Sequence, residues 1–517
     1  MSVDPVSFAG NRLRFFGFAS GLDIDQIVSK LMQAERIPLD RLEQRRQILV
    51  WTKEDYLRIS SLMDELRQAL TPLKLNSTFQ ARTASSSDGG VVSATAAPGT
   101  PAGTHEITVT QLAKGIQLAS SGAISRTSDR RTLWTQFGID PNASPSFTLN
   151  LQVTDSRGPR SASLTFSVTD PSRDDIGDLV AAINNSGLGL TAVYDATLDR
   201  LFITSQETGG SVSLTVGDAT VTLSEGGSDT VWEGLLKLGS TAAPFTGQDA
   251  VFSLDGASGL QVSTNRFTIG GVTYELKGLG TATVTVFQDT DAMVQAITAF
   301  VDKYNEALGE INGKVSERRL YDYPPLTEAQ KKDMTQDEID AWQKKARQGL
   351  LQANSLLISI ASRMRLDVSN RVQGTGSVYT TLASIGITTG SYEEGGKLYV
   401  DEAKLREALQ TDPYGVAALF TTAGTSSDTQ GVAIRLGSTL DLAIGRIRTR
   451  AGLAGVEVDG SGLGREIALL DDQMARMEER LSALEERYYR QFSVMEEVLA
   501  QLGAQAAWLS QQFGGGG

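Results

Sequence analysis

Both ends of this chain carry long runs of apolar residues spaced alternately three and four positions apart. That spacing places one narrow apolar seam along a helix, as in a coiled coil. The seams are flanked mainly by Glu and Arg, so neither can bury itself and each helix needs another helix to lie against. The C-terminal seam consists of Ile467, Leu470, Met474, Met477, Leu481, Leu484, Tyr488, Met495, Val498 and Leu502. The N-terminal seam consists of Leu42, Leu49, Tyr56, Ile59, Met63, Leu66, Leu70 and Leu73.

Several kinds of partner could bury the apolar residues of these seams. The tail helix can pair with the head helix of the same chain, or both can pair with copies of themselves. Alternatively, both are core helices of one terminal domain, although a narrow stripe with charged flanks suits a bundle seam better than a wide core face. We predict that the residues of both seams serve coiled-coil assembly.

Local signals predict where the terminal helices begin and end. Asp23 and Gln26 form a plausible capping pair for a helix that starts there. Pro38 is expected to interrupt this helix, and a second helix can begin at the same point, because proline is tolerated in a first turn. The glycine-rich segment 454–466 is expected to be a flexible joint before the C-terminal helix.

A β-rich region separates the two helical ends. After Thr78 the composition shifts to Ser, Thr, Gly and Ala, and apolar residues alternate with polar ones, which is typical of strands. Hairpin turns are predicted at Gly217-Asp218 and Gly270-Gly271, and one helix is predicted within 173–187. Helical spacing returns near residue 290, with a stripe at Met293, Ile297, Phe300, Tyr304, Leu308 and Ile311.

The predicted fold is therefore α+β and multidomain. Long N- and C-terminal helices form a coiled-coil or helical-bundle stem, and β-rich head domains are inserted between them. The expected segments are an N-terminal assembly segment (1–40), an N-terminal stem helix (41–78), one or two β-rich head domains (79–286), a helical stem domain (287–455) and a C-terminal coiled-coil assembly segment with a glycine tail (456–517).

Composition argues against most chemistry. The chain has no Cys and a single His, His105, in 517 residues, so thiol chemistry is excluded and an imidazole-based catalytic or metal site is not expected. A net charge of −14 argues against nucleic-acid binding. No apolar run approaches the ~18 residues of a membrane span, and residues 1–21 lack the apolar core of a secretory signal peptide. We predict a non-enzyme without cofactor, metal, nucleic-acid partner or membrane insertion.

Several blocks of the sequence resemble, in order, one bacterial family. The stretch "FGFASGLDIDQIVSKLMQAERIPLDRLEQRR" is similar to the N-terminal signature of the flagellar filament cap proteins, the flagellar hook-associated protein 2 family. Residues near 161–216 resemble the β-α-β-β repeat of flagellin-type axial proteins, and "FVDKYNEALGEI" resembles the C-terminal region of the family. The stretch "YDYPPLTEAQKKDMTQDEIDAWQKKARQGLL" is similar to cap proteins of Gram-positive type.

The resemblance implies a structural cap at the distal tip of the bacterial flagellar filament, which retains exported flagellin and promotes its polymerisation. It implies a ring-like homo-oligomer whose partners are flagellin, hook–filament junction proteins and a flagellar export chaperone. It also implies an extracellular location, reached through the flagellar type III system without a cleaved signal peptide. Two alternatives stay open: another flagellar axial protein, namely a hook–filament junction protein or a flagellin, and a surface adhesin acting through the β-rich head.

Overall fold

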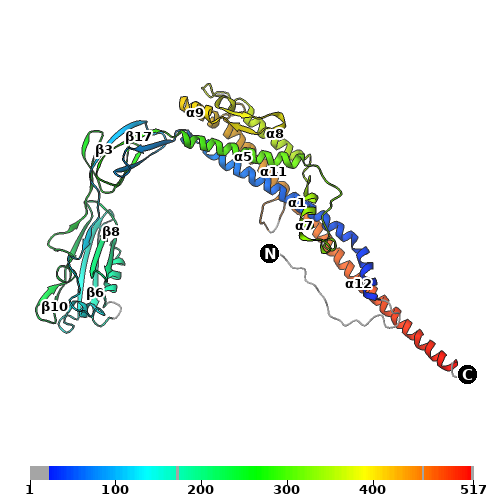
Figure 1. Cartoon of the computed structure of the whole chain (residues 1–517), viewed down its shortest axis with the longest axis horizontal. Coiled ribbons are helices and arrows are strands. Elements are labelled where there is room, and N and C mark those ends of the chain that lie inside the picture. Colours follow the sequence, from blue (N-terminus) through cyan, green and yellow to red (C-terminus); the bar gives the residue numbers. More distant parts are fainter. Residues whose placement is uncertain (1–22, 171–173, 457–458, 514–517) are drawn as a thin grey trace. The chain divides into compact units, whose positions relative to one another are not determined.

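The computed structural model describes residues 23–513 except 171–173 and 457–458. The chain divides into two compact units, a helical unit from Met1–Phe79 and Met293–Gly517 and a β unit from Gln80–Ala292. Helices occupy the two ends of the sequence and strands the insert between them, as the colours of Figure 1 show. The expected α+β fold with long terminal helices and inserted β-rich domains is confirmed. The N-terminal end of the expected assembly segment and the glycine tail lie outside the described residues.

Helix α1 (Ile24–Leu73) is the first long element of the helical unit. Its predicted start is confirmed, because the Asp23 carboxylate accepts a hydrogen bond from the backbone N–H of Gln26 at 2.9 Å. The predicted interruption at Pro38 is wrong, since α1 continues through that residue and through Pro72. The ribbon bends in its dark-blue N-terminal part (Figure 1), and bending is how a long helix accommodates a proline.

The core of the helical unit forms where the second half of α1 packs with α11 on one side and with α5 (Thr290–Ser316) on the other, and where α11 packs with α8. The predicted apolar stripe of α5 is confirmed, since all six of its residues are buried. Phe420 stacks on Phe79 with ring centroids 5.6 Å apart and meets Phe300 edge-on at 6.4 Å, so α2, α5 and α10 share one aromatic contact. The remaining elements are α2 (Asn76–Phe79), α6 (Glu328–Lys332), α7 (Gln336–Arg347), α8 (Ser355–Ser369), η2 (Leu382–Ile385), β18 (Ile387–Thr389), η3 (Tyr392–Glu394), β19 (Leu398–Val400), α9 (Glu402–Thr411), α10 (Pro413–Thr421), α11 (Val432–Ala451) and α12 (Gly462–Phe513).

One hydrophobic core of the β unit lies between two antiparallel sheets. The first sheet has the order β1-β17-β3-β13-β14 and the second the order β15-β16-β2. Phe267 stacks on Phe252 with ring centroids 4.5 Å apart. The hairpin predicted at Gly270-Gly271 is confirmed, because β15 and β16 pair directly across it. These strands are β1 (Arg82–Ser86), β2 (Val92–Ala96), β3 (Gly103–Gln111), β13 (Ala250–Leu254), β14 (Ala257–Val262), β15 (Arg266–Ile269), β16 (Val272–Leu276) and β17 (Gly280–Gln288).

A second core in the β unit is built from sheets of order β12-β9-β5-β6 and β4-β8-β7, covered by α4. The predicted helix within 173–187 is confirmed as α4, and the predicted repeat corresponds to β6, α4, β7 and β8. These elements are β4 (Gln117–Ala119), α3 (Leu133–Phe137), β5 (Ser146–Asp155), β6 (Gly158–Ser167), α4 (Ile176–Asn184), β7 (Leu190–Asp195), β8 (Arg200–Ser205), β9 (Ser213–Gly217), β10 (Thr220–Thr222), β11 (Ser228–Thr230), η1 (Val231–Leu235) and β12 (Phe245–Thr246).

The hairpin predicted at Gly217-Asp218 is wrong. β9 pairs with β5 and β12, whereas β10 pairs with β11. The physical reason is a longer-range contact: the Asp218 carboxylate accepts hydrogen bonds from the backbone N–H groups of Trp232 at 2.7 Å and Glu233 at 3.1 Å. These bonds hold the start of η1 and direct the chain away from β9.

Candidate assembly surface

Helices α1 and α12 pack against each other in antiparallel orientation. Near one end of the contact Arg46 forms an ion pair with Asp471. Toward the other end the Tyr488 hydroxyl donates to the Glu35 carboxylate at 3.3 Å. Residue numbers therefore increase along α12 in the direction in which they decrease along α1. The partner of the tail helix within this chain is the N-terminal helix.

The base of α12 is fixed to α1 by a capped turn. The Asp459 carboxylate lies 2.6 Å from the Lys53 ammonium and accepts from the backbone N–H of Ser461 at 2.9 Å. The Ser461 hydroxyl accepts in turn from the backbone N–H of Gly464 at 3.0 Å, in the first turn of α12. Burial alone would raise the pKa of Asp459, but Lys53 and Ser461 hold it below its usual value. The expected flexible joint is wrong for the segment from Asp459 onward.

Most residues of the N-terminal seam lie in the interior of the helical unit. Leu42 and Leu49, in the part of α1 that runs beside α12, are half-buried. The rest of the seam belongs to the core shared with α5 and α11, so these side chains are not presented to another chain in this structure. The buried members, each 4% exposed or less, are Tyr56, Ile59, Met63, Leu66, Leu70 and Leu73.

The side chains of the C-terminal seam become more exposed toward the end of α12. Leu470 and Leu481 are buried, at 4% and 8% exposure. Val498 and Leu502, farther along the same seam, are 47% and 55% exposed. The intermediate members are half-buried: Ile467, Met474, Met477, Leu484, Tyr488 and Met495.

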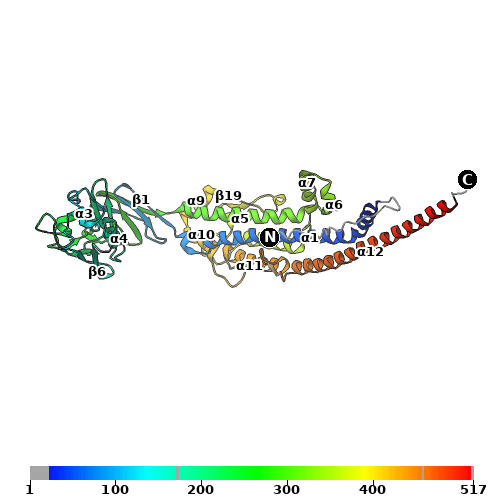
Figure 2. The same ribbon diagram turned by 90° about the horizontal axis from the view of Figure 1, so that it is seen from below.

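The last part of α12 extends past the start of α1, as Figure 2 shows. The printed contacts of Tyr488 and Tyr489 reach Glu35 and Asp25, and Asp25 lies in the first turn of α1. Beyond them α12 continues to Phe513, which at 1.5 Å per residue is about 36 Å of helix. Its exposed apolar side chains, which we call the terminal apolar set, are Val494, Val498, Leu499, Leu502, Trp508 and Leu509.

Sequence reasoning missed four residues of the terminal apolar set. Val494, Leu499 and Trp508 lie beside the three-four spacing, and Leu509 lies one heptad beyond the last predicted seam residue. In the sequence these residues widen the apolar face of the helix from one seam to a broader stripe. A pattern defined by a single seam does not include them.

A segment between α5 and α8 braces the α1–α12 pair. Arg347 of α7 donates to the buried carboxylate of Asp55 at 2.6 Å, and the Lys314 ammonium lies 3.4 Å from the same group. The Gln44 side chain donates to the carbonyl of Pro325 at 2.8 Å. A cleft of about 370 Å³ lies between α1, this segment and Met474 of α12. Burial, with nearby carboxylates, raises the pKa of Glu43 at the cleft wall.

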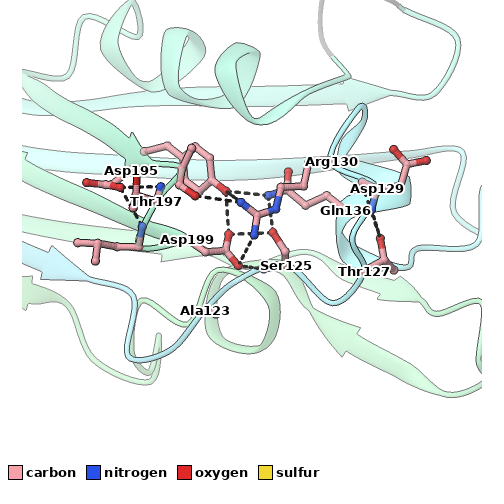
Figure 3. Close-up of polar contacts among 12 residues, drawn as sticks. Ala123, Ser125, Thr127, Asp129, Arg130, Gln136, Asp195, Thr197 and Asp199 are labelled. Atoms are coloured by element: carbon pink, nitrogen blue, oxygen red, sulfur yellow. Dashed lines mark hydrogen bonds and ion pairs between the residues drawn. The ribbon is translucent and has the colours of Figure 1, made fainter.

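One polar cluster in the β unit has the residue types of a catalytic site (Figure 3). The Asp199 carboxylate accepts from the Tyr194 hydroxyl at 2.7 Å, the Ser125 hydroxyl at 2.8 Å and the Ser125 backbone N–H at 2.9 Å. Asp199 has a φ of 54° in the β7–β8 turn and is 5% exposed. Burial would raise its pKa, but these donors hold the pKa below the usual value. Because the Ser125 and Tyr194 hydroxyls both donate to one ionised, buried carboxylate, the cluster stabilises a turn and provides no activated nucleophile.

The rest of the described chain offers few candidates for chemistry. His105 lies in strand β3, with Nδ1 2.7 Å from a carboxylate oxygen of Asp255. Among the described residues, no group of three or more His, Cys, Asp or Glu side chains is arranged to hold a metal ion. Within the same part of the chain, none of the helices is long and apolar enough to cross a membrane.

Comparison with known proteins supplies the family. Residues 20–115 match the "Flagellar hook-associated protein 2 N-terminus" and residues 247–504 match the "Flagellar hook-associated protein 2 C-terminus". The chain is 32% identical to the flagellar hook-associated protein 2 of Halalkalibacterium halodurans, over 97% of this chain and 100% of that protein. The chain belongs to the flagellar hook-associated protein 2 family. The Escherichia coli K12 member of this family is 26% identical over 96% of this chain and 97% of its own length.

The structure agrees with this family. The solved D1-D2-D3 domains of the flagellar cap protein FliD from Escherichia coli superimpose with a TM-score of 0.52 at 25% identity, covering 75% of this chain and 95% of that one. Residues 148–207 match the "Flagellin hook IN motif", which here runs from β5 to β8. Membership in this family identifies a flagellar filament cap, in preference to a flagellin, a junction protein or an adhesin. It also implies an extracellular location associated with the flagellum.

Proposed function

We propose that this chain caps the filament as a ring-like homo-oligomer, retains exported flagellin and promotes its polymerisation. The helical unit supplies the assembly surface, and flagellin, hook–filament junction proteins and an export chaperone are its partners. The chain acts structurally, without catalysis, and leaves the cell through the flagellar type III system without losing a signal peptide.

The observation that carries this proposal is the terminal apolar set. Its six side chains lie on the part of α12 that extends beyond α1, and each is between 38% and 60% exposed. Isolated exposed apolar residues are ordinary on a protein surface, but a cluster along one helix is typical of an interface. The α12 helices of neighbouring subunits in the ring would bury these side chains.

The two parts of the C-terminal seam have different roles in this proposal. The part near Leu481 holds α12 against α1 and so fixes the direction in which the helix leaves the helical unit. The terminal apolar set makes the contacts between subunits. Detaching α12 from α1 would therefore impair assembly even with the terminal apolar set intact.

Complementation of a strain that lacks its filament cap tests the function. The full chain should restore filaments, whereas a variant with Leu481→Asp and Leu484→Asp should release flagellin monomers into the medium. Exchange of the exposed Glu479 and Glu486 for Gln is the matched control and should leave filament length unchanged. Electron microscopy of filaments and immunodetection of flagellin in the medium measure both outcomes. Failure of the full chain to restore filaments, when it is secreted at normal levels, would refute the proposal.

A further inference from the structure

A groove of about 480 Å³ runs between α8 and α11 on the surface of the helical unit. Leu366 of α8 and Leu442 of α11 line it and are 50% and 67% exposed. Arg363 and Arg446, both exposed, line it as well. The groove thus combines apolar side chains with guanidinium groups on a chain whose net charge is −14.

The floor of the groove adds a third guanidinium. Arg435 is 3% exposed and donates to the backbone carbonyls of Asp367 and Asn370, each at 2.5 Å. Burial lowers the pKa of Arg435, and burial likewise raises the pKa of the Asp367 carboxyl, which lies 3.4 Å from Arg363. Arg363 and Arg435 therefore both act on one buried carboxylate, and the Asp428 carboxylate acts on Arg435. The groove carries a surplus of positive charge.

The outer face of α5 and α1 has the complementary charge. Lys303 is shared between Glu65, at 2.6 Å, and Glu306, at 2.9 Å. Arg58 pairs with Glu310 at 3.1 Å in the same way. Asp302 is also exposed here, so four carboxylates accompany two cations and the face is acidic.

Two glycines lie on this acidic face of α5. Gly309 and Gly313 are exposed, and a Cβ added to either would meet nothing within 4 Å. A glycine inside a helix costs about 1 kcal/mol relative to alanine. In exchange, the pair lets the backbone of another helix, or a large apolar side chain, approach α5 closely. Glu306 and Asp302 lie one and two turns before Gly309 on the same side of the helix.

The groove and the acidic face lie on opposite sides of the helical unit. Helices α5 and α11 flank α1 on its two sides, as Figure 2 shows. A contact between opposite faces of identical subunits is heterologous, and such a contact generates a closed ring when the rotation between subunits permits closure. We propose that the α8–α11 groove of one subunit receives the α1–α5 face of a second copy of this chain. This inference rests on the proposed cap function and names a second contact between its subunits, beside that of the terminal apolar set.

Two features make a second copy the occupant. The charges of the two surfaces are opposite, which favours this pairing and disfavours groove against groove. Two apolar side chains line the groove, Leu366 and Leu442. In this contact they can pack against the open surface at Gly309 and Gly313 of the neighbouring subunit.

Engineered cysteines test the contact directly, because the chain has no Cys of its own. The variant Leu442→Cys with Gly309→Cys should form disulfide-linked ladders under mild oxidation, since each groove would present one thiol to the neighbour's α5. The two sites lie on opposite sides of the unit, so a bond within one chain is excluded by the ~7 Å limit on Cα separation. Each single-cysteine variant should stay monomeric on denaturing gels. The matched control pairs Leu442→Cys with Ser482→Cys, an exposed site on α12, and should give no ladder.

Charge exchange gives an independent measurement. Arg363→Glu with Arg446→Glu should weaken self-association of the full chain at least tenfold, as should Asp302→Lys with Glu306→Lys. All four changes in one chain should restore most of the lost affinity, because the surfaces are again opposite in charge. Lys344→Glu, exposed on α7, is the control and should have no such effect. Mass photometry and sedimentation velocity supply the dissociation constants.

The outcomes separate this inference from the cap function. A chain that restores filaments and forms a ring, but gives neither the ladder nor the charge rescue, overturns the groove contact and leaves the cap function intact. A chain that restores no filaments refutes the cap function. A ladder together with rescue by the fourfold exchange supports the contact.

Discussion

Deleting residues 491–517 should weaken self-association strongly while leaving the unfolding of each unit almost unchanged. The deletion removes the terminal apolar set, whose members are 38% to 60% exposed in the single chain. Full burial of a large apolar side chain contributes about 1.5–3 kcal/mol, so the half that is still exposed offers about 1 kcal/mol for each side chain. The set as a whole therefore offers roughly 6 kcal/mol of gross burial free energy per subunit.

Part of that free energy offsets the ordering of side chains and the loss of overall motion on association. We expect about 3 kcal/mol to remain, which corresponds to a dissociation constant roughly a hundredfold larger in the deletion variant. Sedimentation equilibrium over a range of concentrations measures this change. Calorimetry of the same samples, below the dissociation constant, should give melting transitions equal to those of the full chain.

Two point variants sharpen the test. Leu502→Asp should reproduce much of the deletion, because its side chain is 55% exposed in the monomer and would be buried in the ring. Gln501→Ala, at the exposed neighbouring position, should have no effect. The reasoning is refuted if the deletion variant associates like the full chain, or if its helical unit loses its melting transition, because the end of α12 would then be dispensable or part of the core.

Three further predictions concern the separate units. Asp55→Ala should destabilise the helical unit by about 3 kcal/mol in urea unfolding, because Arg347 would lose a buried partner, whereas Glu54→Ala, at a half-exposed pair, should cost under about 1 kcal/mol. Folding raises the pKa of Glu43, so ionised Glu43 destabilises the folded unit once the pH rises through that raised value. Glu43→Gln removes this charge and should stabilise the unit by under about 1 kcal/mol at neutral pH. This gain in stability should vanish below pH 4.5, the ordinary pKa of a Glu side chain, when thermal unfolding is measured as a function of pH. A fragment of residues 80–292 should melt cooperatively as a β-rich monomer in circular dichroism, and a spectrum of unfolded chain would contradict the division into units.

Local patterns in the sequence predicted elements whose determinants lie within a few residues. The stripe of α5 from Met293 to Ile311 is buried as its spacing indicates, and Asp23 caps α1 as its side-chain chemistry indicates. The hairpin at Gly270-Gly271 formed because both glycines adopt the positive φ values, 61° and 84°, that a two-residue hairpin turn requires. The same turn signal at Gly217-Asp218 failed, since the Asp218 carboxylate binds backbone N–H groups near residue 232, and no local pattern records such a contact.

The sequence also determined that both chain ends would be long helices with apolar seams, and the family blocks identified a filament cap. It did not determine which seam residues would be core and which would be surface. Leu481 and Leu502 are three heptads apart and so occupy equivalent positions on the seam of α12, yet they are 8% and 55% exposed. The difference arises because α1 begins at Ile24 and covers only the first part of α12. Burial depends on where the neighbouring helix ends, and only the tertiary structure decides that.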